Sequence, residues 1–140
     1  MEKVLKKLDE VLLCKDPYSS NTEMAGLFLV DVASLFLNDL DQAQKIALEI
    51  AKAYWDKKAT DEERLAQLQI LCDRMDAFMH KGLNYSRPAI INRIVASSLM
   101  TTTGMSYDLC DFIADLTDKV GVPEKLMNDI FCKHIPEFVC

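Results

Sequence analysis

Apolar positions along the chain recur at intervals of three and four residues, which is the spacing of one face of an α-helix. Short polar segments interrupt this pattern, so that it predicts seven helices and no strand. The expected helices cover residues 2–15, 22–38, 40–58, 60–80, 86–100, 106–120 and 123–134. The sequence therefore predicts an all-α protein, a single compact bundle of about seven helices in one domain that spans residues 1–140.

Two of these segments, residues 22–38 and residues 89–100, have almost no polar face. A helix that is apolar all round is usually buried, so we expect these two helices at the centre, shielded by amphipathic ones. Asp31 lies in the middle of the first segment, and Arg93 lies in the second. A buried charge is costly unless it is paired. The two residues therefore either pair or line a cleft, or each lies on a strip that faces solvent.

Several helix ends have recognisable signals. Thr60 followed by Glu63 predicts a capping box at the start of the fourth helix. Gly82 and Gly121 are expected to end the fourth and sixth helices, because glycine accepts the left-handed conformation after a last turn. The pair Asn38-Asp39 is expected to end the second helix and cap the third.

Composition narrows the class of protein. The chain has 140 residues, of which half are hydrophobic, and a net charge of −6, so a direct nucleic-acid binder with a basic face is not expected. No uninterrupted apolar run has the length that a membrane helix requires, and no signal peptide is visible. Five cysteines without a CxxC pair predict reduced thiols in a cytoplasmic protein: Cys14, Cys72, Cys110, Cys132 and Cys140.

The acidic excess is concentrated near the C-terminus. Residues 105–140 hold seven acids and three bases, a net charge of −4 out of the total of −6. Within the sixth helix, one arc is apolar and predicts a core-facing stripe of Leu109, Phe112, Ile113, Leu116 and Val120. A separate arc is acidic and consists of Asp108, Asp111, Asp115 and Asp118.

The acidic arc has two interpretations. One is a solubilising surface, and the other is a docking surface for a basic partner, whose approach complementary charge would accelerate. Tyr107, at the start of the same helix, is a candidate aromatic anchor of the kind enriched at binding hot spots. We take Tyr107 and the four aspartates as the candidate partner-binding residues.

No catalytic or cofactor motif is present. The sequence contains no GxSxG, P-loop, GxGxxG or HExxH, so that no enzyme activity, metal or cofactor is expected. Asp73, Asp76 and His80 share one helix face, but this face is opposite the apolar stripe and its simplest interpretation is a solvated surface. Cys132 and His134 form a second pair of potential ligands, without a matching pair elsewhere.

A segment of the third and fourth helices resembles a known class of proteins. Residues 47–64 read Ala-Leu-Glu-Ile-Ala-Lys-Ala-Tyr-Trp-Asp-Lys-Lys-Ala-Thr-Asp-Glu-Glu-Arg, an alanine-rich helix with late aromatics that leads through a polar turn into an acid-capped helix. This arrangement resembles helical bacterial immunity proteins over about residues 41–79. Such proteins neutralise a cognate toxin, often a nuclease delivered by contact-dependent inhibition or another secretion route.

The resemblance implies a cytoplasmic, non-catalytic protein that presents an acidic surface to a basic nuclease domain; it assigns no functional residue. Together with the acidic arc, it favours an immunity protein that covers its toxin. A self-associating helical adaptor or structural protein is the alternative, so a homo-oligomer stays open. A small helical metal-binding enzyme built on Asp73, Asp76 and His80 is a third hypothesis.

Overall fold

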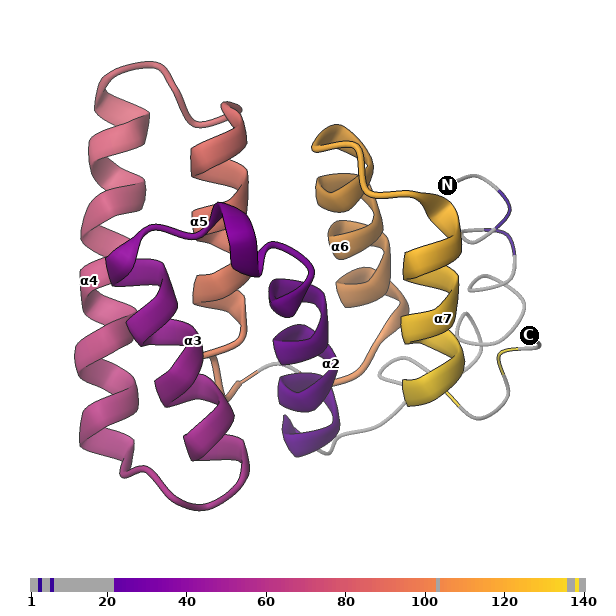
Figure 1. Ribbon diagram of the computed structural model, residues 1–140, viewed down its shortest axis with the longest axis horizontal. Coiled ribbons are helices and arrows are strands. Elements are labelled where there is room, and N and C mark those ends of the chain that lie inside the picture. The colour runs from indigo at the N-terminus through magenta and orange to yellow at the C-terminus, as the bar shows by residue number, and fades with distance from the viewer. Residues whose placement is uncertain (1–2, 4–5, 7–21, 103, 136–137, 139–140) are drawn as a thin grey trace. The chain divides into compact units, whose positions relative to one another are not determined.

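The computed structural model describes residues 3, 6, 22–102, 104–135 and 138, and its regular elements are all helical (Figure 1). The described residues contain six α-helices, one 3₁₀ turn and no β-strand, which confirms the all-α class. Of the helix expected over residues 2–15, the structure describes only Lys3 and Lys6, which are both helical, and the rest lies outside the described residues. The elements are α2 (Thr22–Ser34), η1 (Leu37–Asp39), α3 (Gln42–Trp55), α4 (Asp61–His80), α5 (Arg87–Ser97), α6 (Tyr107–Lys119) and α7 (Glu124–His134).

The chain forms two compact units. Unit 1 comprises residues 1–28 and 102–140, and unit 2 comprises residues 29–101. Helix α2 begins in unit 1 and ends in unit 2, so that the division falls within a continuous helix. A single domain over residues 1–140 stays a prediction, and each unit is described by itself.

In unit 2, helices α3, α4 and α5 pack against one another in pairs (Figure 1). Helix α5 is the most enclosed of the three, because residues 89–99 are all buried except Arg93. Leu48 of α3, Leu71 of α4 and Ile94 of α5 are completely buried. The burial of α5 agrees with its apolar sequence. Arg93 and Asp31 are both half-buried, so neither is a fully enclosed charge.

Helix α2 is shorter than its apolar sequence predicts. It ends at Ser34, whose hydroxyl donates to the carbonyl of Val30 at 2.7 Å, and a 3₁₀ turn follows. The expected cap at Asn38-Asp39 is wrong, because the side chain of Asp41 accepts from the backbone N–H of Gln44 at 3.0 Å and caps α3. The Gln44 side chain in turn accepts from the backbone N–H of Asp41 at 3.1 Å, which completes a capping box.

Polar side chains of α3 and α4 hold the C-terminal end of α5. The indole of Trp55 donates to the carbonyl of Ser98 at 2.7 Å, and the guanidinium of Arg64 donates to the carbonyl of Leu99 at 2.8 Å. The last carbonyls of a helix have no partner within it, so these bonds replace water at a buried helix end. Arg64 also binds Asp61 at 2.9 Å and lies over the ring of Tyr54.

Helices α3, α4 and α6 end in one common geometry, the Schellman motif. In each, the N–H of the second residue past the cap reaches back to a carbonyl in the last turn: Lys58 to Ala53, Leu83 to Phe78 and Val122 to Thr117. The residue before it has a positive φ of +62° at Lys57, +68° at Gly82 and +79° at Gly121. The two glycines confirm the expected helix ends, whereas Lys57 holds a conformation that disfavours a side chain.

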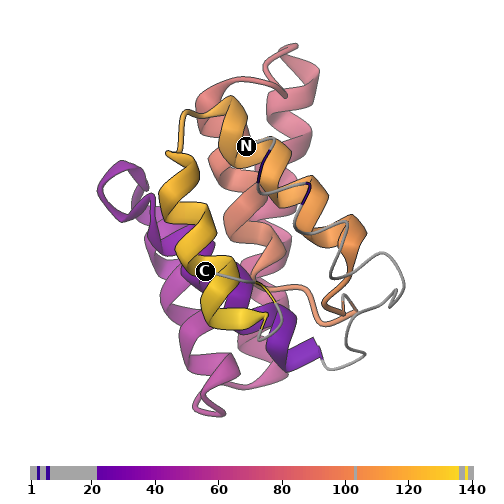
Figure 2. The same ribbon diagram turned by 90° about the vertical axis from the view of Figure 1, so that its right-hand side faces the viewer.

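The described core of unit 1 is aromatic and sulfur-rich. Helices α6 and α7 follow one another in the chain and are both visible in Figure 2. The ring of Phe131 stacks on Phe28 at 5.5 Å between centroids and lies 5.6 Å from Phe138. His134 meets the edge of Phe28 at 5.8 Å. These contacts bury an aromatic cluster in the unit to which α7 belongs.

The cysteines differ in state. Cys72 and Cys110 are free thiols, as the sequence predicts, but Cys132 is disulfide-bonded. Cys14 and Cys140 lie outside the described residues. The expectation of five reduced thiols is therefore wrong, because spacing along the chain does not show which sulfur atoms meet after folding. Among the described residues, no helix is both long and apolar enough to cross a membrane.

Candidate functional site

Helix α6 carries the candidate site and is built by a clear division of its faces. The hydroxyl of Ser106 accepts from the backbone N–H of Leu109 at 3.1 Å and begins the helix. The buried face then includes Leu109, Ile113 and Leu116 from the expected stripe. Thr117 is also buried. Its hydroxyl donates to backbone carbonyls of the preceding turn, so this polar group is satisfied without water. Packing on this face orients the opposite face towards solvent.

The four aspartates lie on that opposite face, which we call the acidic face and define as Asp108, Asp111, Asp115 and Asp118. Three of them are exposed and Asp111 is half-buried. Asp115 accepts from the ammonium group of Lys119 at 2.9 Å, an exposed pair worth about 0–1 kcal/mol. One carboxylate of the acidic face is therefore partly neutralised by a lysine. The i,i+4 spacing of Asp115 and Lys119 is the sequence pattern that indicates this ion pair.

Phe112 is not in the core, contrary to the sequence prediction. Its side chain is 41% exposed. On the helix it lies one turn after Asp108 and just under one turn before Asp115, so an exposed aromatic ring borders the acidic face. On the other side of the buried face, away from Phe112, Cys110 and Ala114 are completely buried and belong to the core.

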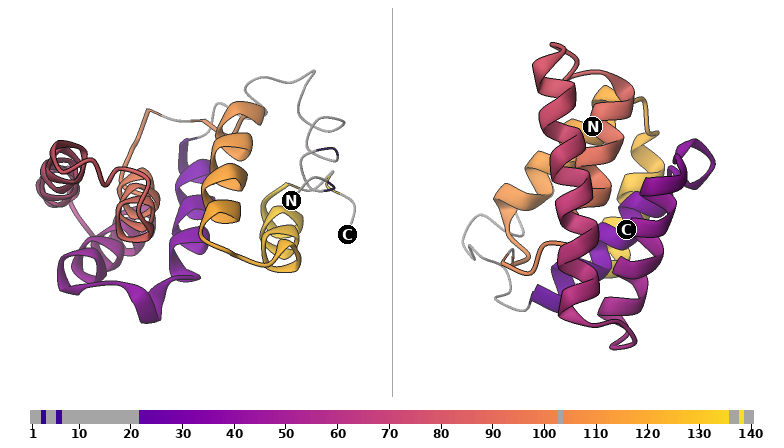
Figure 3. Two further views of the ribbon diagram at one scale, coloured as in Figure 1. Left: turned by 90° about the horizontal axis from the view of Figure 1, so that it is seen from above. Right: turned by 90° about the vertical axis from the view of Figure 1, so that its left-hand side faces the viewer.

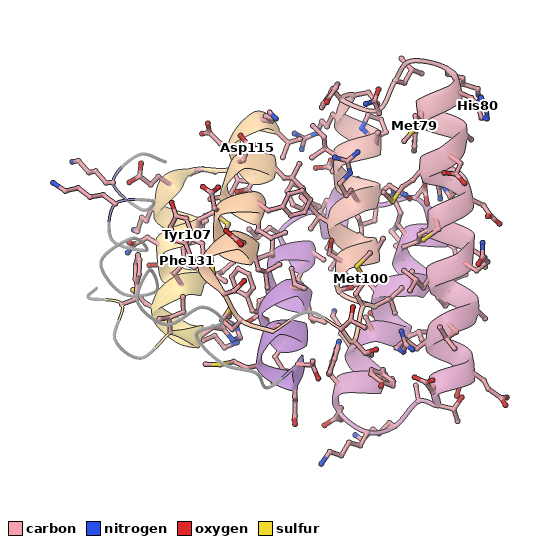
Figure 4. The ribbon with its side chains drawn as sticks, turned by 180° about the vertical axis from the view of Figure 1, so that it is seen from behind. Met79, His80, Met100, Tyr107, Asp115 and Phe131 are labelled. Atoms are coloured by element: carbon pink, nitrogen blue, oxygen red, sulfur yellow. The ribbon has the colours of Figure 1, made fainter. Side chains whose placement is uncertain are left out.

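Tyr107 lies on the other edge of the acidic face. It is the first residue of α6 and is half-buried, and it precedes Asp111 by one turn (Figure 4). Tyr107 also makes a contact of its own, so it is less available to a partner than a fully exposed ring. Phe112 is thus the better placed aromatic. Its apolar side chain falls within the stripe predicted to face the core, so the sequence pattern does not distinguish it from the buried residues.

The candidate metal ligands do not converge in the described part of the chain. Asp73, Asp76 and His80 are all exposed on α4, and no group of three His, Cys, Asp or Glu side chains with metal-binding geometry occurs among the described residues. Cys132 is engaged in its disulfide, and His134 packs against Phe28.

The free thiols are poor nucleophiles. Burial raises the pKa of the Cys110 thiol to about 12, and burial together with the nearby carboxylates of Asp76 and Asp73 raises the pKa of Cys72. A reactive cysteine needs a lowered pKa to populate the thiolate. A groove in unit 2 is lined by Arg74, Ala77, Phe78, Lys81 and Leu83, none of which is an acid, a histidine or a cysteine.

Comparisons of the chain with protein-family models, with characterised proteins and with solved structures find no match. The resemblance to immunity proteins thus stays a prediction from the sequence, and the geometry of the surface carries the functional argument.

Proposed function

We propose that this protein is a non-catalytic binding protein, an immunity protein that docks the acidic face of α6 onto a basic toxin domain of the nuclease type. The observation that carries the proposal is the exposed ring of Phe112, which lies next to the exposed carboxylates of Asp108 and Asp115. Binding hot spots combine a desolvated aromatic anchor with a polar surround that excludes water, and this surface has both parts.

The charge of the surface indicates the chemistry of the partner. Helix α6 has one basic residue, Lys119, to balance the negative charge of the four aspartates of the acidic face. A nuclease binds a polyanion and therefore has a positive substrate-binding surface, which an acidic inhibitor can cover. In this arrangement the carboxylates steer the encounter and the phenylalanine ring supplies buried apolar area.

The test uses a nuclease toxin domain encoded beside this protein's gene, with inhibition of the nuclease and association kinetics across a salt series as readouts. Replacing Phe112 by Ala should weaken binding by roughly tenfold or more, mainly through faster dissociation. The double variant Asp108→Asn with Asp115→Asn should slow association and reduce its salt dependence. Adding Asp111→Asn and Asp118→Asn should enlarge both effects.

A matched control lies on α3 and its C-terminal cap residue. Glu49→Gln with Asp56→Asn removes the same charge from exposed acids that also pair with lysines, and it should leave the kinetics unchanged. If the α6 variants bind with parental rates and salt dependence while the control does the same, the acidic face is not the docking surface. If no toxin partner exists and the chain forms a stable homo-oligomer, the adaptor hypothesis replaces the proposal.

A further inference from the structure

Helix α4 carries two parallel rows of side chains, each with the alternating spacing of three and four residues. One row faces the core of unit 2, and its members are held there: Leu71 is completely buried, Arg64 is 6% exposed and Arg74 binds Asp41 of α3. The second row is shifted by one residue. It consists of Leu65, Leu68, Cys72, Met75 and Met79, which we call the outer row.

The outer row is apolar but is not enclosed by the fold. Leu65 is 49% exposed and Met79 is 60% exposed, while Leu68, Cys72 and Met75 are half-buried. The apolar stripe expected on this helix therefore consists of a packed row and a partly exposed row. In the right-hand view of Figure 3, α4 is the helix of unit 2 nearest the viewer, and Met79 is marked at its end in Figure 4.

The spacing of the outer row is that of a coiled-coil seam. Successive members are separated by three, four, three and four residues, which corresponds to positions a and d of a heptad repeat. Such a seam is complementary to the apolar stripe of another helix. The two methionines and the cysteine add polarisable, adaptable contact surface, which is frequent where a helix is bound.

Charge along the border of the outer row indicates which helix fits. Glu62 lies within one turn of Leu65, and Asp76 lies within one turn of both Cys72 and Met79; both acids are exposed. The two arginines of α4 do not balance them, because Arg64 binds Asp61 and Leu99 and Arg74 binds Asp41. Basic residues beside the stripe of a bound helix would pair with these acids, whereas a second copy would bring acids against acids.

We propose that the outer row of α4 binds an amphipathic helix of another protein that carries lysine or arginine beside an apolar stripe. This interface is separate from the acidic face of α6, because it lies in unit 2 on a different helix. The exposed carboxylates of Glu62 and Asp76 border the apolar seam and select basic neighbours.

The test measures binding of the full-length chain to a synthetic labelled peptide of about three heptads, with leucine at positions a and d and lysine at positions e and g. A peptide of the same composition with the leucines scattered round the helix is the control. Leu65→Gln with Met79→Gln should weaken binding of the first peptide by roughly tenfold or more, since two apolar contacts are lost. Glu62→Gln with Asp76→Asn should weaken it less and reduce its salt dependence.

Two further readouts separate this site from the acidic face. Bound peptide should slow alkylation of Cys72, measured by mass spectrometry of the peptide that contains it. Phe112→Ala and Asp108→Asn with Asp115→Asn should leave the affinity for the peptide unchanged, so failure here and failure of the proposed function are independent. Circular dichroism and unfolding curves check that each variant folds.

Three outcomes would overturn the proposal. The first is equal binding of the scattered peptide, which would indicate attraction by charge alone. The second is an affinity that Leu65→Gln with Met79→Gln leaves at the parental value. The third is a dimer of the chain itself, seen by sedimentation and abolished by the same substitutions, which would assign the outer row to a second copy.

Discussion

Asp41 shows how much one side chain contributes when two elements share it. Its carboxylate caps α3 by accepting from Gln44, and it also pairs with the guanidinium of Arg74 on α4. The hydrogen bond from Arg74 is the main reason that the pKa of Asp41 lies below its ordinary value of 3.8. A carboxylate with a lowered pKa stabilises the fold above its unfolded-state pKa, and this contribution is lost as the pH falls through the lowered value.

Replacing Asp41 by Asn should therefore change how stability depends on pH. Asparagine caps a helix about as well as aspartate but carries no charge. At neutral pH we expect the variant to be less stable by about 1 kcal/mol or less, because the pair is partly exposed. The difference should shrink as the pH falls below 3.8, which urea unfolding at a series of pH values measures.

The variant Arg74→Gln is the matched partner of this experiment. It leaves the carboxylate and removes the charge that lowers the pKa, so it should remove the same pH-dependent part of the stability. If the difference in unfolding free energy between Asp41→Asn and the parent stays constant down to acid pH, the ion pair does not cause that difference.

The ends of the helices show how local sequence determines the length of an element. Helices α3, α4 and α6 all end in a Schellman motif, but only the last two have glycine at the left-handed position. Lys57 adopts a φ of +62° in a solvent-exposed turn. A side chain at this position costs about 1 kcal/mol relative to glycine. The hydrogen bond from the N–H of Lys58 to the carbonyl of Ala53 closes the motif around it.

Replacing Lys57 by Gly should stabilise the protein by about 0.5–1 kcal/mol, because glycine adopts the positive φ without strain. Thermal or urea unfolding gives the change. Replacing Gly82 by Ala is the reverse experiment at the end of α4, where φ is +68° and no neighbouring atom would meet the new Cβ. It should destabilise by a similar amount, and an equal sign for the two substitutions would contradict the explanation.

The sequence predicts elements better than it predicts their partners. The Thr60 capping box and the glycine stops at Gly82 and Gly121 are confirmed, because each depends on residues only a few positions apart. The bond between Asp41 and Arg74 joins residues 33 positions apart, and no local pattern indicates it. On α6, helical periodicity identifies the acidic face, but periodicity alone cannot show that the side chain of Phe112 stays 41% exposed in the folded protein.

At the scale of the whole molecule, unit 1 and unit 2 each contain one residue whose exposure can be measured separately during unfolding. The chain has a single tryptophan, Trp55, which is buried in unit 2, and Cys110 is completely buried in unit 1. Each residue therefore reports on one unit. If residues 1–140 form one domain, the exposure of Trp55 and the exposure of Cys110 follow one cooperative unfolding transition.

We expect the two transitions to coincide. Tryptophan fluorescence in a urea series gives the midpoint for unit 2, and brief alkylation at each urea concentration, followed by peptide mapping of Cys110, gives the midpoint for unit 1. The folded-state thiol is protected by its burial and by a pKa raised to about 12, so labelling measures opening. Two separate midpoints would show that the units are independently folding domains.

The two rows of α4 also imply two rates of evolutionary change within one helix. Substitutions at Arg64 or Leu71 disturb buried contacts, and selection for a folded protein removes them. Polar substitutions at Leu65 or Met79 lie at exposed positions and cost the fold little, so folding alone does not keep leucine and methionine there. In a lineage that has lost the helical partner, hydrophilic residues should accumulate along the outer row, while the core-facing row with Arg64 and Leu71 stays unchanged.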